Sequence, residues 1–531
     1  MFSLRMNALA VALAALSIAP MASAGTPYPT RETPKAVDLG VPAGTQDSSI
    51  TVTVALKLRN TGQVDELMHS LYTPGSSQYH HFLSTADFQA RFAPSPATVT
   101  KTMAAFEAQG LKVTRLSSGL LRVSGSQAAI EKAFRVSLHT FEVPAQGHNG
   151  SYRFHAPTTA PTLNASLGDS VVGVVGLDNR PRYRPHIQRM PDGVKSQLTR
   201  EGSAPAASGA PATPDQPGLW TVTDFADYYD VNPLYAQGVN GGNVTIGIVT
   251  LAAFTPSDAF GYWNSLGLNV DPNRITIVDV DGGPGAPSDA SGSDETTLDV
   301  EQSGGIAPGA KVIVYQSPNT DQGFVDAFAQ AIDNNQADSL STSWGIWEAF
   351  DDGTDVTNPN TQNTETQLQV FNELFTQAAL QGQSLYSSAG DAGAYDANDP
   401  RIFPQPEFTK VLSVDSPASE PYITAAGGTT LPGPQLFGLP DGSTFTVKIA
   451  HEQVWGWDYL TKLCATLGFD PASCGIFPGG GGGGVSSYFN TPLYQFRISG
   501  VAKTEPNQSL VDTGQNPPQT LITLPAHFWG R

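Results

Sequence analysis

The sequence predicts an α/β fold with a doubly wound parallel sheet, preceded by a smaller α+β domain. Three apolar runs of strand character, at residues 244–249, 311–316 and 384–388, alternate with amphipathic helical segments. This β-α-β-α-β order is typical of parallel strands joined by right-handed crossover helices. A stretch rich in Pro, Ala and Ser over residues 181–217 divides the two parts. We interpret it as a linker, because such a composition does not bury a core and is accessible to proteases.

The front domain is predicted over residues 25–180 from one clear strand and several short elements. Apolar and polar side chains alternate over residues 49–59, which indicates a half-buried strand. Helices are expected near residues 64–71 and 97–109, and Ser126 is expected to cap a third helix. Shorter strands are expected at residues 111–115, 120–123 and 136–141.

The main domain is predicted over residues 218–531 and opens with a segment from Trp220 to Tyr235. The helix before the last of the three strands should end at Gly382, because glycine permits the left-handed backbone of a helix end. The other elements expected between the strands are a helix containing Phe324 to Ile332, a strand at 339–343 and a helix over 364–381. Active groups of such sheets gather at the carboxyl ends of the strands.

The first 24 residues have the pattern of a secretory signal peptide. Arg5 supplies the basic start, an apolar run spans residues 8–19, and Ala22-Ser23-Ala24 is a small-residue cleavage pattern. A transmembrane helix is the alternative, but the run is short and Pro20 with polar chain follows it. We therefore expect a secreted protein, extracellular or periplasmic, with no membrane contact after signal cleavage.

The two cysteines fit an exported protein. Cys464 and Cys474 enclose nine residues, and a disulfide between them would stabilise this loop by about 2–3 kcal/mol in the chain-entropy account. A metal pair or a thiol nucleophile would need clustered His and Cys residues, which the sequence does not supply there. We therefore expect a Cys464–Cys474 disulfide.

Charge is distributed unevenly along the chain. Residues 1–200 hold 19 Lys and Arg against 12 Asp and Glu, a net charge of +7, whereas residues 201–531 hold 9 against 36, a net charge of −27. The two parts should attract each other near neutral pH, and less strongly as carboxylates protonate in acid. The overall charge of −20 disfavours nucleic-acid binding. A solvated acidic surface, common in exported proteins, is the simpler interpretation of the same numbers.

Three carboxylates are the candidate catalytic groups. Glu295 and Asp299 stand four residues apart at the start of a predicted helix, so that both point from one face. Asp391 follows the strand at 384–388 within Ala-Gly-Asp-Ala-Gly. Such groups suit acid–base catalysis and charge stabilisation. Each also has a structural interpretation: Glu295 as an acid at a helix N-terminus, Asp299 as a surface residue and Asp391 as a turn former.

Other catalytic patterns are disfavoured. Residues 201–531 contain His451 and His527 as their histidines, neither in a Gly-rich or strand-end context, so a Ser-His-Asp triad is not expected. Asp512-Thr513-Gly514 has the letters of an aspartic protease, but it occurs once and no apolar strand follows it. The run Gly479–Gly484 lacks the Lys-Ser/Thr of a phosphate loop and is interpreted as a flexible or closely approached backbone segment.

Several short motifs occur in a fixed order along the chain. In the main domain they are Glu295-(x)3-Asp299 with the following Gly-Gly-Ile-Ala-Pro-Gly-Ala, Ser341-Thr-Ser-Trp-Gly345, Ser388-Ala-Gly-Asp391, Pro421-Tyr-Ile-Thr-Ala-Ala-Gly-Gly-Thr429, and residues 480–489 with Pro492-Leu-Tyr-Gln495. In the front domain they are Ser77-Gln-Tyr79-His-His-Phe-Leu83 and Phe88-(x)3-Phe92-Ala-Pro94. Together these motifs resemble the sedolisin family of serine-carboxyl peptidases with a kumamolisin-type activation propeptide. The resemblance covers nearly the whole chain after the signal.

The resemblance implies a subtilisin-like fold and endopeptidase activity in acid on protein or peptide substrates. In that mechanism Glu295 is the general base, Asp299 its orienting partner and Asp391 the protonated acid of the oxyanion hole. The substrate-binding residues that it implies are Ser343, Trp344 and Gly345. It also implies a monomer whose own propeptide acts as an intramolecular inhibitor, and a bound Ca²⁺.

The sequence departs from the family at the nucleophile. The family's Ser lies in a Gly-Thr-Ser segment near the C-terminus, and Gly-Thr-Ser does not occur in these 531 residues. The calcium-binding loop expected after it is missing too, so we expect no metal ligands in this chain. We interpret the sequence as a C-terminally truncated or partial precursor whose 531 residues are inactive. The alternative is an inactive exported peptide-binding protein that kept the groove and lost the nucleophile.

Overall fold

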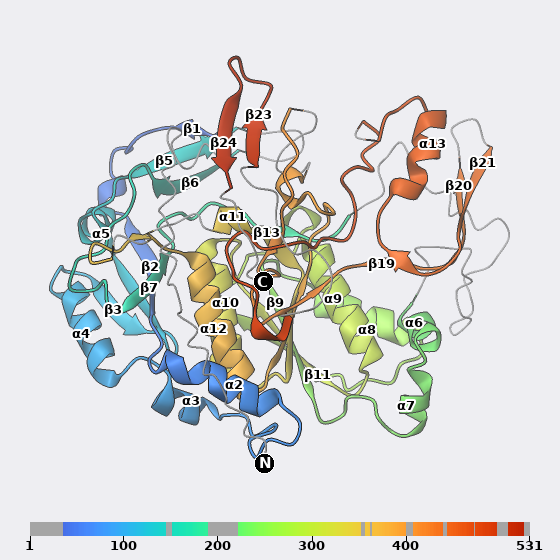
Figure 1. Cartoon of the computed structure of the whole chain (residues 1–531), viewed down its shortest axis with the longest axis horizontal. Helices are drawn as coiled ribbons and strands as arrows, with labels where there is room; N and C mark the ends of the chain where they lie inside the picture. The colour runs from blue at the N-terminus through green and yellow to red at the C-terminus, as the bar shows by residue number, and fades with distance from the viewer. Residues whose placement is uncertain are drawn as a thin grey trace, which may run out of the picture.

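The computed structural model describes residues 36–144, 151–188, 221–351, 356–361, 364–399, 407–438, 443–471, 473–495 and 508–524 (Figure 1). The expected signal peptide and residues 189–217 of the expected linker lie outside the described residues. None of the described helices combines the length and the apolar character needed to span a lipid bilayer.

The main domain is built on a six-stranded parallel sheet. In sheet order the strands are β10 (Ile275–Asp279), β11 (Lys311–Gln316), β9 (Thr245–Thr250), β12 (Ser339–Thr342), β16 (Ser384–Ser388) and β18 (Thr424–Ala426). Strands β10 and β11 lie on one side of β9, and β12, β16 and β18 lie on the other side. This is the doubly wound arrangement predicted from the sequence.

Helices cover both faces of this sheet, because its strands bury side chains in both directions. The covering helices are α8 (Pro256–Ser265), α9 (Ser293–Ile306), α10 (Asp321–Asn334) and α12 (Gln367–Gln381). Val249 of β9 packs with residues of α10 and α12, whereas its neighbour Ile248 packs with residues of α8 and α9. Helix α12 ends at Gly382, as predicted, with a φ of 78°. A side chain there would collide with the ring of Phe82 at 2.4 Å.

The front domain contains a four-stranded antiparallel sheet and a smaller three-stranded one. The strands of the first are, in order, β3 (Lys112–Arg115), β4 (Leu120–Ser126), β2 (Ser49–Leu56) and β7 (Val171–Val175), and those of the second are β1 (Val37–Asp38), β5 (Leu138–Val143) and β6 (Tyr152–Pro157). The helices are α2 (Val64–Tyr72), α3 (Thr85–Arg91), α4 (Pro96–Glu107) and α5 (Gln127–Phe134). Ser126 caps α5, as predicted, by accepting a hydrogen bond from the amide of Ala129 (3.3 Å).

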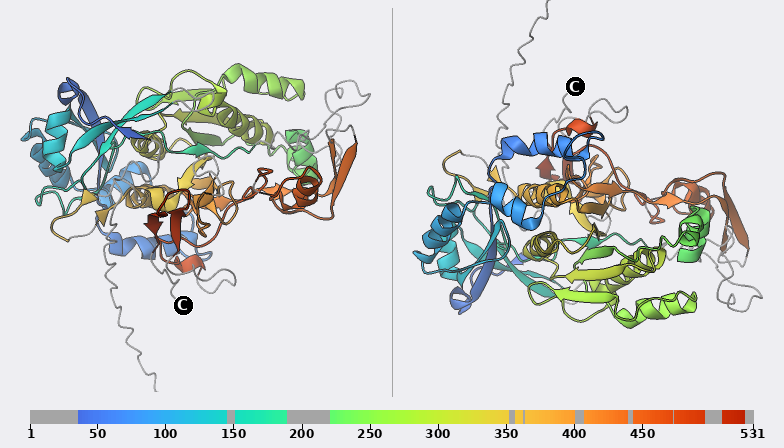
Figure 2. Two further views of the ribbon diagram at one scale, coloured as in Figure 1. Left: turned by 90° about the horizontal axis from the view of Figure 1, so that it is seen from above. Right: turned by 90° about the horizontal axis from the view of Figure 1, so that it is seen from below.

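The prediction that β2 is half-buried is wrong, because its sheet is covered on both faces. One face meets α4 and α5, and the other meets α10 and α12 of the main domain (Figure 2). Thr53, expected on the polar face, is 1% exposed and donates a hydrogen bond to Asp326 (3.0 Å). Arg122 of β4 forms an ion pair with the same carboxylate (3.1 Å) and pairs with Asp281. The front domain is therefore docked on α10 through buried polar contacts as well as apolar ones.

Residues 181–188, which the sequence assigns to an accessible linker, are packed into the main domain. Strand β8 (Arg184–Pro185) pairs antiparallel with β13 (Trp344–Trp347). The side chain of Arg182 is 2% exposed, and Tyr183 is fully buried. Composition does not reveal this burial, because it depends on main-domain carboxylates that are distant in the sequence.

The predicted disulfide is present in a lobe of the main domain. Cys464, in α13 (Thr461–Thr466), is bonded to Cys474, and their Cα atoms are 5.8 Å apart. Both cysteines pack in a small apolar cluster with Trp457 and Leu460. The same lobe carries a hairpin of β20 (Gly433–Gly438) and β21 (Thr444–Ile449) (Figure 1).

Candidate active site

Glu295 and Asp299 lie one turn apart near the start of α9. The helix begins after Gly292, whose φ of 89° is left-handed. Gly292 also leaves room for the ring of Trp344, because a Cβ at this position would lie 2.7 Å from that ring. Glu295 is 2% exposed, and Asp299 is half-buried. The close approach of Trp344 thus fixes where α9 starts, and with it the position of both carboxyl groups.

Ser343 connects this acid pair to the edge of the sheet. Its hydroxyl donates a hydrogen bond to Oδ1 of Asp299 (2.8 Å), and its carbonyl oxygen accepts one from the amide of His186 (2.8 Å). The remaining oxygens, Oε2 of Glu295 and Oδ2 of Asp299, are buried and have no hydrogen-bond partner among the described residues. The pair can therefore accept a further donor, such as a hydroxyl group.

A cavity of about 500 Å³ lies beside the acid pair. It is lined by Phe225, Glu295, Leu298, Asp299, Gln302, Ser303, Ser341 and Ser343. Its volume falls within the range of small-ligand sites. The cavity therefore gives the acid pair access to a reacting group.

Asp391 lies just beyond the carboxyl end of β16 and is 8% exposed. Gly390 before it has a φ of 93°, and the carbonyl oxygen of Asp391 accepts a hydrogen bond from the amide of Gly480 (2.8 Å). The glycine run approaches so closely that a Cβ on Gly482 would lie 1.7 Å from the carbonyl oxygen of Ala389. Of the two interpretations of this run, close backbone approach is the one that the structure supports.

The three acids influence each other electrostatically. Burial raises the pKa of Glu295, and the negative charges of Asp299 and Asp391 raise it further. Burial also raises the pKa of Asp299, although the hydrogen bond from Ser343 and the charge of His186 offset part of that rise. The protonated forms of Glu295 and Asp299 are thus favoured, so Glu295 must lose its proton before it can accept one from a reacting group.

Trp344 and Gly345, predicted to bind substrate, pair through their backbone with the neighbouring segment. The indole of Trp344 is 1% exposed and donates a hydrogen bond to Oγ1 of Thr250 (3.0 Å), so its ring supports the site from behind. Trp344 pairs with Pro185, and Gly345 pairs with Arg184. A Cβ on Gly345 would lie 2.0 Å from Oδ1 of Asp415. Strand β13 therefore holds an extended chain segment by backbone pairing, a recurrent mode of peptide binding.

The residues around His186 were not predicted from the sequence. The imidazole lies between Ser388, which contacts Nδ1, and Asp415, whose Oδ2 is 3.2 Å from Nε2. Its side chain is 4% exposed, and that of Asp415 is 1% exposed. The available signal was the alternation of basic residues in Arg-Pro-Arg-Tyr-Arg-Pro-His over 180–186, which places basic side chains on one side of an extended strand.

Asp512, whose motif the sequence disfavours as catalytic, belongs to a turn. Asp512 ends β23 (Ser509–Asp512) and accepts a hydrogen bond from the amide of Gly514 (2.9 Å), which makes it a turn former. No group of three or more His, Cys, Asp or Glu side chains suited to a metal ion occurs in the described part of the chain.

Comparison with known proteins agrees with the motifs. Residues 35–180 match the family described as Pro-kumamolisin, activation domain. Kumamolisin from a Bacillus species is 29% identical over 478 residues, which cover 88% of this chain and 73% of kumamolisin. Sedolisin from a Pseudomonas species is 28% identical over 461 residues, covering 85% of this chain and 68% of sedolisin. Xanthomonalisin from a Xanthomonas species is 29% identical over 482 residues, covering 86% of this chain and 52% of xanthomonalisin.

The activation domain precedes, in the sequence, the α/β domain that holds the three acids. The relatives match across both domains. These matches bear out the family that the motifs suggested. The activation domain and the relatives together support a precursor of the sedolisin family with an N-terminal activation propeptide.

Proposed function

We propose that this protein is a secreted, acid-acting endopeptidase made as an inhibited precursor. The observation that carries the proposal is the gathering of Glu295, Asp299 and Asp391 at one sheet edge, beside a cavity and a backbone edge that holds an extended segment. Glu295 is the general base, Asp299 orients it, and Asp391 in its protonated form donates a hydrogen bond to the substrate carbonyl oxygen as negative charge develops.

The reaction requires a nucleophilic serine, for which no Gly-Thr-Ser segment exists in the 531 residues. The oxygens of Glu295 and Asp299 that lack hydrogen-bond partners among the described residues are the acceptors that such a hydroxyl needs. Attack of the serine oxygen on the peptide carbonyl transfers its proton to Glu295. Glu295 then returns the proton to the leaving amine, which leaves an acyl-enzyme for water to hydrolyse.

The propeptide inhibits the peptidase in the same chain, and we propose that residues 181–188 do so directly. The amide of His186 donates to the carbonyl of Ser343, whose hydroxyl is bonded to Asp299. The peptide bond between His186 and Ile187 therefore directly follows a residue whose amide is bonded to the carbonyl of Ser343 beside the acid pair. We propose this bond as the first processing site within the interval 181–217.

Further properties follow from the resemblance and are proposed here with it. The pattern of residues 1–24 supports secretion, and the substrates are proteins or peptides bound as extended strands on β13. Calcium binding and a monomeric state are expected from the family. The peptidase relatives do not favour the alternative of an inactive peptide-binding protein.

The test compares the 531-residue chain with the same chain extended by a C-terminal segment that carries Gly-Thr-Ser. The extended protein should hydrolyse a denatured protein substrate in acid, and a serine-directed peptide aldehyde should block it. The 531-residue chain should show no hydrolysis, because acid and base groups do not replace a nucleophile. Aldehyde-sensitive hydrolysis by the 531-residue chain, or an inert extended protein that is folded, would contradict the proposal.

A further inference from the structure

Two residues before β8, the chain enters a pocket of the main domain that is separate from the three catalytic acids. We define this anchor pocket by Asn319, Asp321, Phe324, Asp351 and Gln367. These residues come from the region before α10, from α10 itself, from the end of α11 (Glu348–Asp351) and from the start of α12. Its occupants are Arg182 and Tyr183.

Arg182 enters the pocket as a fully buried cation. Its Nη1 lies 2.9 Å from Oδ2 of Asp321, and its Nη2 lies 3.9 Å from Oδ1 of Asp351. Nη2 also donates a hydrogen bond to the carbonyl of Phe350. The side chains of both aspartates are 0% exposed. Two buried carboxylates need a paired cation, because an uncompensated buried charge is strongly destabilising.

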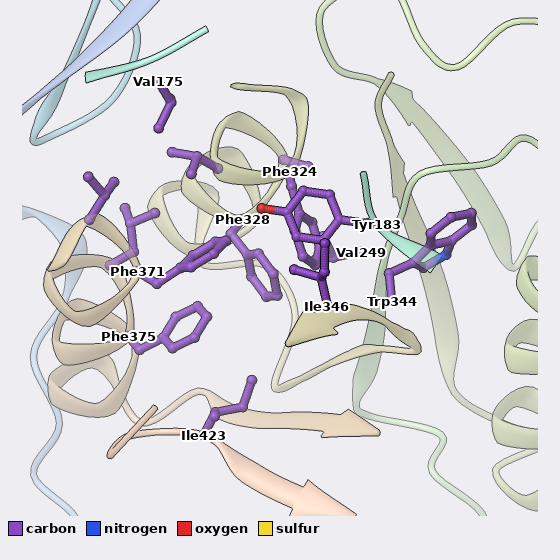
Figure 3. Close-up of a cluster of buried hydrophobic side chains, with 14 of the residues drawn as sticks. Val175, Tyr183, Val249, Phe324, Phe328, Trp344, Ile346, Phe371, Phe375 and Ile423 are labelled. Atoms are coloured by element: carbon purple, nitrogen blue, oxygen red, sulfur yellow. The ribbon is translucent and has the colours of Figure 1, made fainter. Parts of the chain in front are cut away.

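Tyr183 is held by its backbone, its hydroxyl and its ring. Asn319 accepts a hydrogen bond from the amide of Tyr183 (3.1 Å) and donates one to its carbonyl oxygen (2.9 Å). The phenol donates to Oδ1 of Asp351 (2.7 Å) and accepts from the amide of Gln367. The ring meets Phe324 edge-on, with centroids 4.6 Å apart, among the apolar side chains of the main domain (Figure 3). The pocket thus provides hydrogen-bond partners for the hydroxyl, the amide and the carbonyl oxygen of Tyr183.

We propose that the anchor pocket is a second peptide-binding site, specific for a basic residue followed by a tyrosine. Arg182 and Tyr183 stand four and three positions before His186, whose amide is bonded to the carbonyl of Ser343. Processing frees the segment to leave, and the pocket then contains two buried carboxylates and a polar–aromatic slot. A substrate with the same pair at the same spacing restores all of these contacts. This use of the pocket rests on the proposed peptidase function, whereas binding itself does not.

The proposal predicts that a free peptide competes with the segment in the chain. The probe is a fluorescein-labelled peptide of residues 180–188, Arg-Pro-Arg-Tyr-Arg-Pro-His-Ile-Gln, and the readout is fluorescence polarisation at neutral pH. The receptor is the full chain with R182K and Y183F. These changes roughly keep the volume of the two side chains, but they remove the guanidinium that contacts Asp321 and Asp351 and the hydroxyl that contacts Asp351. The variant should bind the probe about tenfold more tightly than the unmodified chain does.

Two controls give the experiment its specificity. A probe with Ala in place of Arg182 and Tyr183 should bind the variant no more tightly than it binds the unmodified chain. A receptor that carries D351N in addition should likewise lose the tenfold increase in affinity for the original probe. Equal binding of the probe to the unmodified and variant chains, or equal binding of the two probes to the variant, would overturn the proposal. If the double variant does not fold, as judged by circular dichroism, Y183F alone is the receptor. Glu107→Gln, at the exposed end of α4, should leave probe binding unchanged. Binding is read by fluorescence polarisation and the peptidase proposal by hydrolysis, so failure of the anchor pocket and failure of the peptidase proposal give different results.

Discussion

The hydroxyl of Ser343 lies 2.8 Å from Oδ1 of Asp299, while the carbonyl of the same serine holds the amide of His186 at 2.8 Å. One residue thus contacts both an acid of the site and the chain segment that occupies it. A displacement of the Ser343 backbone by this segment would therefore change the hydrogen bond between the Ser343 hydroxyl and Asp299. Ser343 was assigned to substrate binding from its motif, and its contacts extend that assignment to the positioning of Asp299.

Replacing Ser343 with Ala should raise the pKa of Asp299 further, because the hydrogen bond from Ser343 is one of the two influences that lower it. The measurement is carboxyl titration by NMR on protein with ¹³C-labelled Asp, with Asp299→Asn used to assign the signal. Ser343→Thr keeps a hydroxyl and should largely restore the original titration. An unchanged titration in Ser343→Ala would show that this hydrogen bond does not control Asp299.

Glu295→Gln should nearly abolish peptide hydrolysis in the protein that carries the nucleophile, because the amide cannot accept the serine proton. Asp391→Asn should reduce turnover by about 10²–10³, the usual scale for losing one oxyanion donor. Turnover is measured with a quenched fluorescent peptide in acid, and circular dichroism shows whether each variant is folded. Near-normal turnover in either variant would remove that residue from the mechanism.

The free energy of unfolding should fall as the pH rises from about 4 toward neutrality. Burial raises the pKa of Glu295, Asp299, Asp326, Glu348 and Glu420. Between the ordinary carboxyl pKa and these raised values, the folded chain binds more protons than the unfolded chain does, so stability decreases with increasing pH.

Glu295→Gln should flatten part of this decrease, as measured by urea unfolding at several pH values. Glu107→Gln, at the exposed end of α4, controls for the loss of a surface charge. A pH dependence that is the same in both variants would show that Glu295 does not contribute.

Arg122→Ala should loosen the docking of the propeptide, because it removes the cation paired with buried Asp326. Loss of one partner of a fully buried pair costs about 3–5 kcal/mol. Since the Arg122 side chain is 32% exposed, we expect about 1–2 kcal/mol. Arg153→Ala is the matched control: its side chain is 65% exposed in the pair with Glu142, and it should cost less than about 0.5 kcal/mol. Chemical denaturation gives both values, and similar costs would contradict the role of Asp326.

The precursor that carries the nucleophile should be latent near pH 7 and process itself in acid, with Ile187 as the first new N-terminus. The +7 front part and the −27 remainder attract each other less once carboxylates protonate. Protonation also allows Asp391 to donate its hydrogen bond. N-terminal sequencing after incubation at several pH values measures both claims. Processing that is equally fast at neutral and acid pH would refute the electrostatic account, and a first cut elsewhere would refute the assignment of His186–Ile187.

The sequence predicted those parts of the fold that depend on local signals. The bounds of β11 and β16 are the predicted ones. For β11 the reason is that a buried parallel strand is a nearly continuous apolar run between turns. Gly382 marks the end of α12, because a left-handed helix end favours glycine. Strand β10 and helix α8 lack comparably strong local patterns and were not predicted.

Contacts between the two domains were not predictable in the same way. Thr53 looks like a solvent-facing strand residue until α10 covers it with Asp326. Arg182 and Tyr183 look like linker until Asp321 and Asp351 surround them. Asp415 has no local motif that connects it with His186. In each case the partner lies more than a hundred residues away, so no periodicity or spacing could reveal it.

The glycine run beside Asp391 limits which sequences this site tolerates. Gly482 is required by space, because any side chain would occupy the position of the Ala389 carbonyl. Gly483 has open space around its Cβ position, but its φ of 139° excludes most other residues by conformation alone. Two adjacent positions are thus restricted to glycine for unrelated reasons, and no compensating change elsewhere relieves both. Random mutagenesis of this segment should therefore show a steep loss of function in a stretch that contributes no chemical group to the reaction.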